Sequence, residues 1–402
     1  MTQTTTCDIE RIERIRLALK ESAMDAVVCT LPSRVLMLSG YWPVVGTSIA
    51  IVTSEGFVVL VAPEDERDLA LNGWADEVRF FAPGSLSELS SSVENVYSPL
   101  SDVAATLGLA GKTVIGYEAD AVFEPVSYAA MHLYGAAIRE LLHEIFPAAT
   151  LKSASDLITR LRSTLTSYEV ERVRTACRIA ETAFKEGAKA FHAGLSELEV
   201  AALFRTPLST QSFAGVERAD GFTYCMSGPN SVCAYASYQR STSRKVETGD
   251  LMLVHCNSYA DGYWTDITRT FCIGEADERK LKMYDAVLAA RTAALASIRA
   301  GVKAAAVDEA AREVMIDCGF GQEFRHGLGH CVGYAAINHN APPRLHPRSD
   351  DVLATGMVFN VEPACYIDGF GGLRHCDMVL VTATGAEVLT PFQNNTRDLT
   401  LH

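Results

Sequence analysis

Four apolar, strand-like segments in the second half of the chain carry ionisable side chains, and no other feature constrains the fold as much. These side chains are His255 with Asp266, His326 with His330, Glu362, and Arg374. A charge that is buried without a partner is costly, so such residues are normally paired or bound to a metal. A fold rarely carries four such segments without a function. We therefore predict that Asp266, His330 and Glu362 converge in one water-excluding cavity lined by strands.

The first half of the chain alternates between predicted strands and predicted helices. Helices are expected over residues 8–23, 103–107 and 128–145. Strands are expected over 26–30, 48–52, 57–61 and 113–117, with a hairpin turn at 54–56. Strands that alternate with helices are typical of an α/β domain. A linker is expected over 153–165, after this domain.

The second half contains two similar helical units. A helix is expected over 169–190, and the turn Gly194-Leu195-Ser196 precedes a second helix over 199–205. Gly301-Val302-Lys303 precedes a helix over 307–318 in the same way. Two copies of one element indicate an internal repeat, with a site expected at the interface between the copies. Strands predicted over 251–256, 270–273, 357–362 and 378–382 indicate a curved, mostly antiparallel sheet flanked by these helices.

Charge and composition exclude several classes of protein. The net charge of −14 disfavours nucleic acid and anionic membranes as partners, because both bind basic surfaces. No apolar run approaches the roughly 20 residues that span a bilayer, and the first residues do not resemble a secretion signal. The 11 cysteines form no regular framework. We expect reduced thiols and a cytoplasmic location.

Four segments resemble the pita-bread hydrolases, the family of creatinase, prolidase, Xaa-Pro aminopeptidase and methionine aminopeptidase. In chain order they are GDLMLVHCNSYADGYWTDITRTF, HGLGHCVG with NHNAPP, GMVFNVEPACY, and GGLRHCDMVLVT. The resemblance implies an α/β creatinase-like N-terminal domain over residues 1–155. It also implies an α+β pita-bread catalytic domain with a curved antiparallel sheet over residues 165–402. A homodimer is expected.

The positions that bind metal in this family are altered here. Peptidases of the family hold two metal ions through Asp, Asp, His, Glu and Glu. The matching positions of this chain are, in order, His255, Asp266, His330, Glu362 and Cys376. A further family histidine falls on Tyr235, and another is kept as His339.

Three interpretations of this altered centre remain open. In the first, the chain resembles creatinase and hydrolyses a carbon–nitrogen bond of a small molecule without metal, with His330 or His326 as general base. Creatine itself is not expected as the substrate, because Tyr235 replaces the catalytic histidine. In the second, Asp266, His330, Glu362 and Cys376 bind one zinc or iron ion in an Xaa-Pro peptidase-like enzyme. In the third, the fold is a non-catalytic binding module.

Other side chains are predicted to contact a small amide, amidine or lactam substrate. His339 or Tyr235 would contact its carbonyl oxygen, with Glu362 and Asp266 orienting water or the leaving nitrogen. His326, His255 and Arg374 are the remaining substrate-binding candidates within the second half. Tyr41 and Trp42 are expected either to cap the substrate by stacking or to form part of a core or dimer interface.

Overall fold

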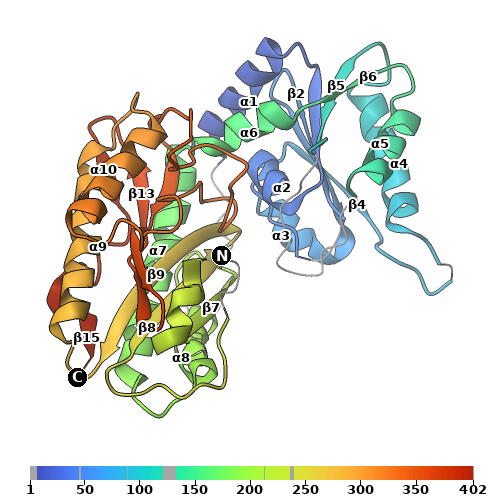
Figure 1. Cartoon of the computed structure of the whole chain (residues 1–402). Helices are drawn as coiled ribbons and strands as arrows, with labels where there is room; N and C mark the ends of the chain where they lie inside the picture. The colour runs from blue at the N-terminus through green and yellow to red at the C-terminus, as the bar shows by residue number, and fades with distance from the viewer. Residues whose placement is uncertain are drawn as a thin grey trace. The chain divides into compact units, whose positions relative to one another are not determined.

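The computed structural model describes residues 7–44, 47–87, 89–120, 133–211, 213–235 and 240–401. The chain divides into two compact units, Met1–Arg162 and Ser163–His402 (Figure 1). We keep 1–155 and 165–402 as the proposed domains. The residues between them are largely helical, because α6 spans Ser155–Ser163. The boundary between the two units falls within the expected linker over 153–165, although most of this segment is helical.

A six-stranded mixed sheet with the order β4-β3-β2-β1-β5-β6 forms the centre of the first unit. Its strands are β1 (Ala26–Cys29), β2 (Ile49–Thr53), β3 (Val58–Pro63), β4 (Glu77–Phe81), β5 (Val114–Tyr117) and β6 (Thr150–Ser153). Strands β1, β2 and β3 form antiparallel neighbours, whereas β5 pairs with β1 in parallel. The central strands are buried on both faces by apolar side chains, as expected for a sheet that helices cover.

The helices of the first unit are α1 (Ile9–Glu21), α2 (Pro32–Ser39), α3 (Arg67–Leu71), α4 (Ser92–Thr106), α5 (Ala136–Ile145) and α6. Helix α4 is much longer than the predicted 103–107, because Ser91 and Glu94 form a capping box at its start. Of the helix predicted over 128–145, residues 136–145 are helical, and 128–132 lie outside the described residues. Helices α4 and α5 pack their apolar faces on the sheet.

Antiparallel strand pairs dominate the second unit. One sheet has the order β15-β9-β8-β7, a second β10-β13-β14 and a third β11-β12. The strands are β7 (Ala219–Ser227), β8 (Leu251–Ala260), β9 (Tyr263–Ile273), β10 (Val358–Val361), β11 (Ala364–Ile367), β12 (Gly371–Arg374), β13 (Asp377–Val381), β14 (Ala386–Val388) and β15 (Thr400–Leu401). A bridge between Thr268 and Cys376 joins β9 to the segment that links β12 and β13.

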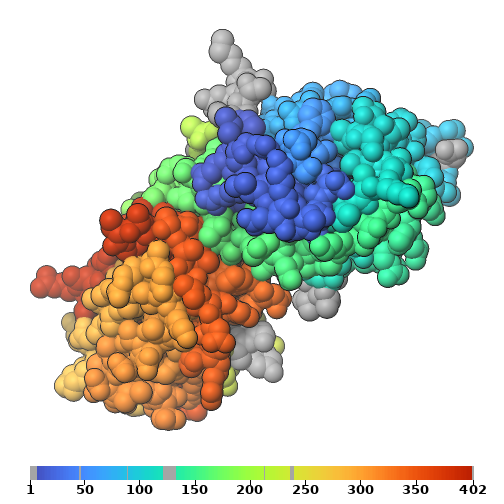
Figure 2. Space-filling model, turned by 90° about the horizontal axis from the view of Figure 1, so that it is seen from above, coloured from blue at the N-terminus to red at the C-terminus, as the bar shows by residue number. Residues whose placement is uncertain are grey.

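The helices of the second unit form two pairs. They are α7 (Ser167–Ala190) with α8 (Glu197–Thr210), and α9 (Glu278–Ser297) with α10 (Ala304–Asp317). Apolar side chains of α9 and α10 pack against the strands in one large core. In Figure 2 the outer face of this second pair is visible as a continuous orange surface. The short 3₁₀ helices η2 (Gly228–Tyr235) and η3 (Thr396–Leu399) complete the unit.

The predicted internal repeat is visible in the main-chain hydrogen bonds. The amide of Gly194 donates to the carbonyl of Val246 (2.9 Å), and that of Gly301 donates to Leu353 (2.8 Å). The amide of Val246 in turn donates to the carbonyl of Leu195, and the amide of Leu353 donates to the carbonyl of Val302. Both glycines have φ near +90°, which other residues adopt only with strain. The two halves therefore use one turn geometry before α8 and α10.

All 11 cysteines lack disulfide partners, as expected. Among the residues that the structure describes, no helix is both long enough and apolar enough to cross a membrane.

Candidate active site

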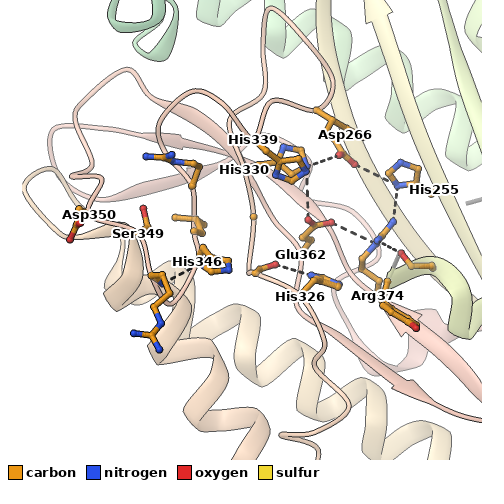
Figure 3. A pocket seen from close by; sticks show the side chains of 18 residues that line it. His255, Asp266, His326, His330, His339, His346, Ser349, Asp350, Glu362 and Arg374 are labelled. Atoms are coloured by element: carbon orange, nitrogen blue, oxygen red, sulfur yellow. Dashed lines mark hydrogen bonds and ion pairs between the residues drawn. The ribbon is translucent and has the colours of Figure 1, made fainter. Parts of the chain in front are cut away.

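The structure brings Asp266, His330 and Glu362 together, as their sequence pattern predicts. The Nε2 atom of His330 lies 3.3 Å from Oδ2 of Asp266 and 3.9 Å from Oε1 of Glu362. None of the three residues is more than 9% exposed. Figure 3 shows them pointing toward one another from separate segments of the chain. Residues almost 100 positions apart in sequence therefore share one buried polar centre.

The β8–β9 hairpin supplies the first half of this centre. Asp261 and Gly262 both have positive φ, which suits the tight turn of a two-residue hairpin. The resulting register places Asp266 opposite Asn257 and His255 opposite Thr268. His255 and Asp266 therefore lie close together, with 3.6 Å between Nδ1 and Oδ1.

Main-chain contacts with β10 hold the second half. The amide of Glu362 donates to the carbonyl of Leu328 (2.8 Å), and the amide of Asn360 donates to the carbonyl of His330 (3.1 Å). Gly329 lies so close to β10 that a Cβ atom there would be 1.9 Å from the Asn360 carbonyl oxygen. Gly329, the second glycine of the His-Gly-Leu-Gly-His segment, is therefore required for the close approach that aligns His330 with Glu362.

His330 has a defined hydrogen-bonding environment. Its Nδ1 lies 3.1 Å from the carbonyl oxygen of Cys331, to which it donates. Burial lowers the pKa of His330, but the hydrogen bond and charge of Asp266, with the charge of Glu362, outweigh burial and raise it above 6.5. The ring of His339 meets that of His330 edge to face at 4.7 Å. A histidine with this pKa can exchange a proton near neutral pH.

Arg374 is a buried cation beside His255. Its Nη2 lies 2.9 Å from Nδ1 of His255, and its Nε donates to the hydroxyl of Thr268 (3.0 Å). A guanidinium can only donate, so Nδ1 of His255 must accept, and its Nε2 donates to Oδ1 of Asn257 (3.0 Å). The Nε of Arg374 also lies 3.8 Å from Oε2 of Glu362. Arg374 is thus positioned to steady that carboxylate.

His255 should make the folded protein sensitive to acid. Burial lowers the pKa of His255 to about 4, although the charge of Asp266 acts in the opposite direction. Between pH 6.5 and 4 the unfolded histidine binds a proton that the folded one does not, so stability falls as pH falls through this window. The expected contribution of His255 is about 3 kcal/mol.

Chemical denaturation at a series of pH values from about 7 down to about 4.5, within the window set by these two pKa values, measures this effect. The variant His255→Gln cannot titrate, so its free energy of unfolding should decline less on acidification than that of the wild type. The exposed His192 is the matched control, and His192→Gln should follow the wild-type curve. Equal slopes for His255→Gln and the wild type would show that His255 is not held neutral.

Cys376 lies next to Asp266, but its thiol makes its closer hydrogen bond to the main chain and not to the carboxylate. Its Sγ donates to the main-chain oxygen of Asp266 (3.2 Å) and lies 3.8 Å from Oδ1. Burial and the charge of Asp266 raise the pKa of Cys376 well above its usual value. The side chain is therefore a neutral thiol in this environment, whereas metals bind the thiolate.

The donor set does not fit the two-metal centre of the family. Within the described ranges, no three His, Cys, Asp or Glu side chains are arranged to hold a metal ion together. The centre holds two carboxylates, Asp266 and Glu362, and one buried cation, Arg374. Two divalent ions would add four positive charges to a buried site that has lost two of the family's carboxylates. Asn360, which the sequence interpretation did not single out, also lies between two of the potential ligands.

A cavity of about 730 Å³ opens from this centre. His255, Asp266, His330, Glu362 and Arg374 line its inner end, and His326, Tyr235 and His339 also line it. Its remaining polar lining includes Arg344, His346, Arg348, Ser349 and Asp350 (Figure 3). The predicted second-unit site residues other than Cys376 therefore border one cavity.

Two of these residues are held by aromatic neighbours. Nε2 of His326 lies 3.1 Å from the hydroxyl of Tyr366, while its Nδ1 donates to the carbonyl of Gly327. Burial lowers the pKa of His326, which favours the neutral ring. Tyr235 is 44% exposed, and its ring centroid lies 5.9 Å from that of Tyr366. Tyr366 was another residue that the sequence interpretation missed.

The two aromatic candidates of the first unit behave differently from each other. Tyr41 is 1% exposed, and its hydroxyl donates to Oε2 of Glu66 (2.6 Å). This burial corresponds to the core alternative and leaves Tyr41 no face for stacking on a substrate. Trp42 is partly exposed, and a capping role for it stays a prediction.

Comparison with known families agrees with this architecture. The model of the creatinase/prolidase N-terminal domain matches residues 11–164, and the model of metallopeptidase family M24 matches residues 171–383. The family description implies that its members use a divalent metal ion. The potential metal-binding side chains of this chain differ from the ligand set expected for the family.

Individual relatives match over nearly the whole chain. The Xaa-Pro dipeptidase of Pyrococcus furiosus is 29% identical over 382 residues, which cover 95% of this chain and 97% of the relative. The crystal structure of the prolidase from Pyrococcus horikoshii OT3 is similar with a TM-score of 0.74 at 26% identity, covering 95% and 98% of the two chains. The X-Pro aminopeptidase structure from Thermotoga maritima gives a TM-score of 0.78 at 24% identity, covering 94% and 99%.

These matches confirm the predicted creatinase-like N-terminal domain and pita-bread C-terminal domain. The chain therefore belongs to metallopeptidase family M24, a family of hydrolases that cleave carbon–nitrogen bonds.

Proposed function

We propose that this chain hydrolyses a carbon–nitrogen bond of a small substrate in the cavity of its second unit, without the paired metal ions of its family. The observation that carries the proposal is the convergence of His330 with Asp266 and Glu362 in a buried centre. Arg374 supplies a fixed positive charge beside them. Such a centre contains a base, two carboxylates and a cation, which together can transfer protons and stabilise the charge that develops during hydrolysis.

His330 acts as the general base in this proposal. In its neutral form its Nε2 exchanges the hydrogen bond from Nδ2 of Asn360 (3.1 Å) for one from the attacking water and takes the water's proton, and the water oxygen bonds to the substrate carbon. The same proton then passes to the leaving nitrogen as the carbon–nitrogen bond breaks. His339 or Tyr235, both at the cavity, contacts the oxygen on which negative charge develops.

The charges of the cavity favour a substrate with a cationic and an anionic end. Asp266 and Glu362 at the inner end suit a positively charged or polarised nitrogen. Arg348 also lines the cavity, and within the described parts of the chain it forms no ion pair with a carboxylate. Arg344, by contrast, is bound to Asp351 through two contacts of 2.8 and 2.7 Å. A short peptide or an amino-acid amide or amidine combines these features.

A second candidate function is an Xaa-Pro dipeptidase with a single metal ion. It is favoured by the similarity to relatives of that name over 95% of the chain. Asp266, His330, Glu362 and Cys376 would hold the ion, zinc or iron, which would polarise the scissile carbonyl when bound. A homodimer and a cytoplasmic location also remain proposals.

A substrate panel separates these functions. The purified chain is treated with a chelator, dialysed and incubated with Xaa-Pro dipeptides, other dipeptides, and small amides and amidines, and products are identified by mass spectrometry. Turnover by the chelator-treated protein is the expected result. Turnover only after addition of zinc or iron would support the second candidate instead. Absence of turnover under both conditions would favour a non-catalytic binding module.

A further inference from the structure

Asn360 lies at the centre of the site without belonging to any predicted set of catalytic residues. It is the third residue of β10 and is fully buried. Its Oδ1 accepts a hydrogen bond from the main-chain amide of His330 (2.7 Å). Because this contact fixes the carbonyl side of the amide, Nδ2 must face the opposite way.

Nδ2 of Asn360 faces the two atoms on which a metal site here would depend. It lies 3.1 Å from Nε2 of His330 and 3.4 Å from Oδ2 of Asp266. An amide nitrogen carries two hydrogens, so it can donate to both acceptors at once. The Nδ1 atom of His330 donates to Cys331, which leaves the Nε2 lone pair to accept this bond.

The amide therefore satisfies two buried acceptors without adding charge. A metal ion at the same place would have to take the Nε2 lone pair and the carboxylate oxygen away from Asn360. The displaced amide would then lose its partners inside a fully buried environment, which opposes metal binding. Cys376 adds to this effect, because its thiol proton already points to a carbonyl oxygen.

We propose that Asn360 is the residue that lowers the metal affinity of this site, by donating its side-chain amide to His330 and Asp266 where its relatives' site would hold an ion. The inference rests on the proposed function, since it explains how the centre stays ordered without metal. It also makes Asn360, together with the altered ligand positions, a determinant of metal affinity.

The test measures zinc binding by variants at this position. Asn360→Asp keeps an oxygen for the amide of His330 and replaces the donor with a negatively charged ligand. Asn360→Ala removes the donor altogether. The matched control is Asn394→Asp, which adds the same charge at an exposed position of the same unit. Each full-length chain is treated with a chelator and dialysed, then titrated with Zn²⁺ by calorimetry and melted with and without Zn²⁺.

Asn360→Asp is expected to bind one Zn²⁺ on the order of 100-fold more tightly than the wild type, the scale on which neighbours of metal ligands alter affinity. Its Tm should rise on addition of zinc, because binding to the folded state stabilises it. Asn360→Ala should bind zinc more tightly than the wild type, though less tightly than Asn360→Asp. Asn394→Asp should match the wild type.

The proposal is overturned if both Asn360 variants bind Zn²⁺ no more tightly than the wild type, or if the wild type already binds one equivalent as tightly as Asn360→Asp. If Asn360→Ala does not fold, the comparison of Asn360→Asp with Asn394→Asp decides alone. None of these measurements needs a substrate. Failure of the proposed hydrolysis therefore leaves the zinc result interpretable, and the reverse also holds.

Discussion

His330→Ala is expected to lower kcat/KM by about 10²- to 10⁴-fold, the usual contribution of a general base, while the chain remains folded. The physical reason is that no other described side chain places a basic nitrogen within 4 Å of both Asp266 and Glu362. The measurement uses the substrate that the wild type turns over fastest, with circular dichroism and Tm as checks on folding.

The pH profile gives this prediction a second observable. A base must be neutral to accept a proton, and Asp266 raises the pKa of His330 above 6.5 after burial has lowered it. Wild-type kcat/KM should therefore rise as pH increases through this pKa. His192→Ala, at an exposed position, serves as the control and should keep full activity. Turnover by His330→Ala at the wild-type rate would end the assignment of His330 as base.

Asp377→Ala is expected to destabilise the second unit strongly. Asp377 is fully buried, and its two oxygens accept from Arg269 (2.6 Å) and Arg291 (2.5 Å), with a further bond from Thr390 (2.9 Å). Removing the carboxylate leaves two guanidinium groups without their buried partner. The cost of breaking such a network is about 3–5 kcal/mol.

For a unit of this size, that cost corresponds to a fall in Tm of roughly 10 °C. Thermal unfolding followed by circular dichroism measures it directly. Asp317→Ala, at the exposed end of α10, is the matched control and should shift Tm by much less. If Asp377→Ala melts within a degree or two of the wild type, the network does not stabilise the fold as the contacts indicate.

Arg269 and Arg374 are both buried, and the tertiary structure gives them different partners. Arg269 forms an ion pair with Asp377 (2.6 Å) and does not line the cavity. Arg374, a substrate-binding candidate, lies beside His255 and Glu362 and lines the cavity.

Helix α4 and Tyr41 show where the local sequence pattern was not sufficient. Helix α4 was expected only over residues 103–107, whereas the capping box at Ser91 and its packing on the sheet stabilise the full helix, with Pro99 inside it. Tyr41 was expected either to cap a substrate or to form part of a core or dimer interface, and the hydrogen bond that its hydroxyl donates to Glu66 accompanies the core alternative. In both cases the contacts of the folded unit decided what the local pattern had left open.

The sequence by itself determined the fold family, the order of the elements and the segments that form the site. The fold family followed from the resemblance of four segments to the pita-bread hydrolases. Hydrophobic periodicity, which acts locally along the chain, indicated the elements. Only the tertiary structure decided which nitrogen of His255 and of His330 accepts, that Cys376 is a neutral thiol, and that Asn360 lies between His330 and Asp266. These properties depend on side chains from separate segments of the chain that meet in a buried space, where desolvation and hydrogen bonding set protonation, and no spacing along one chain encodes that meeting.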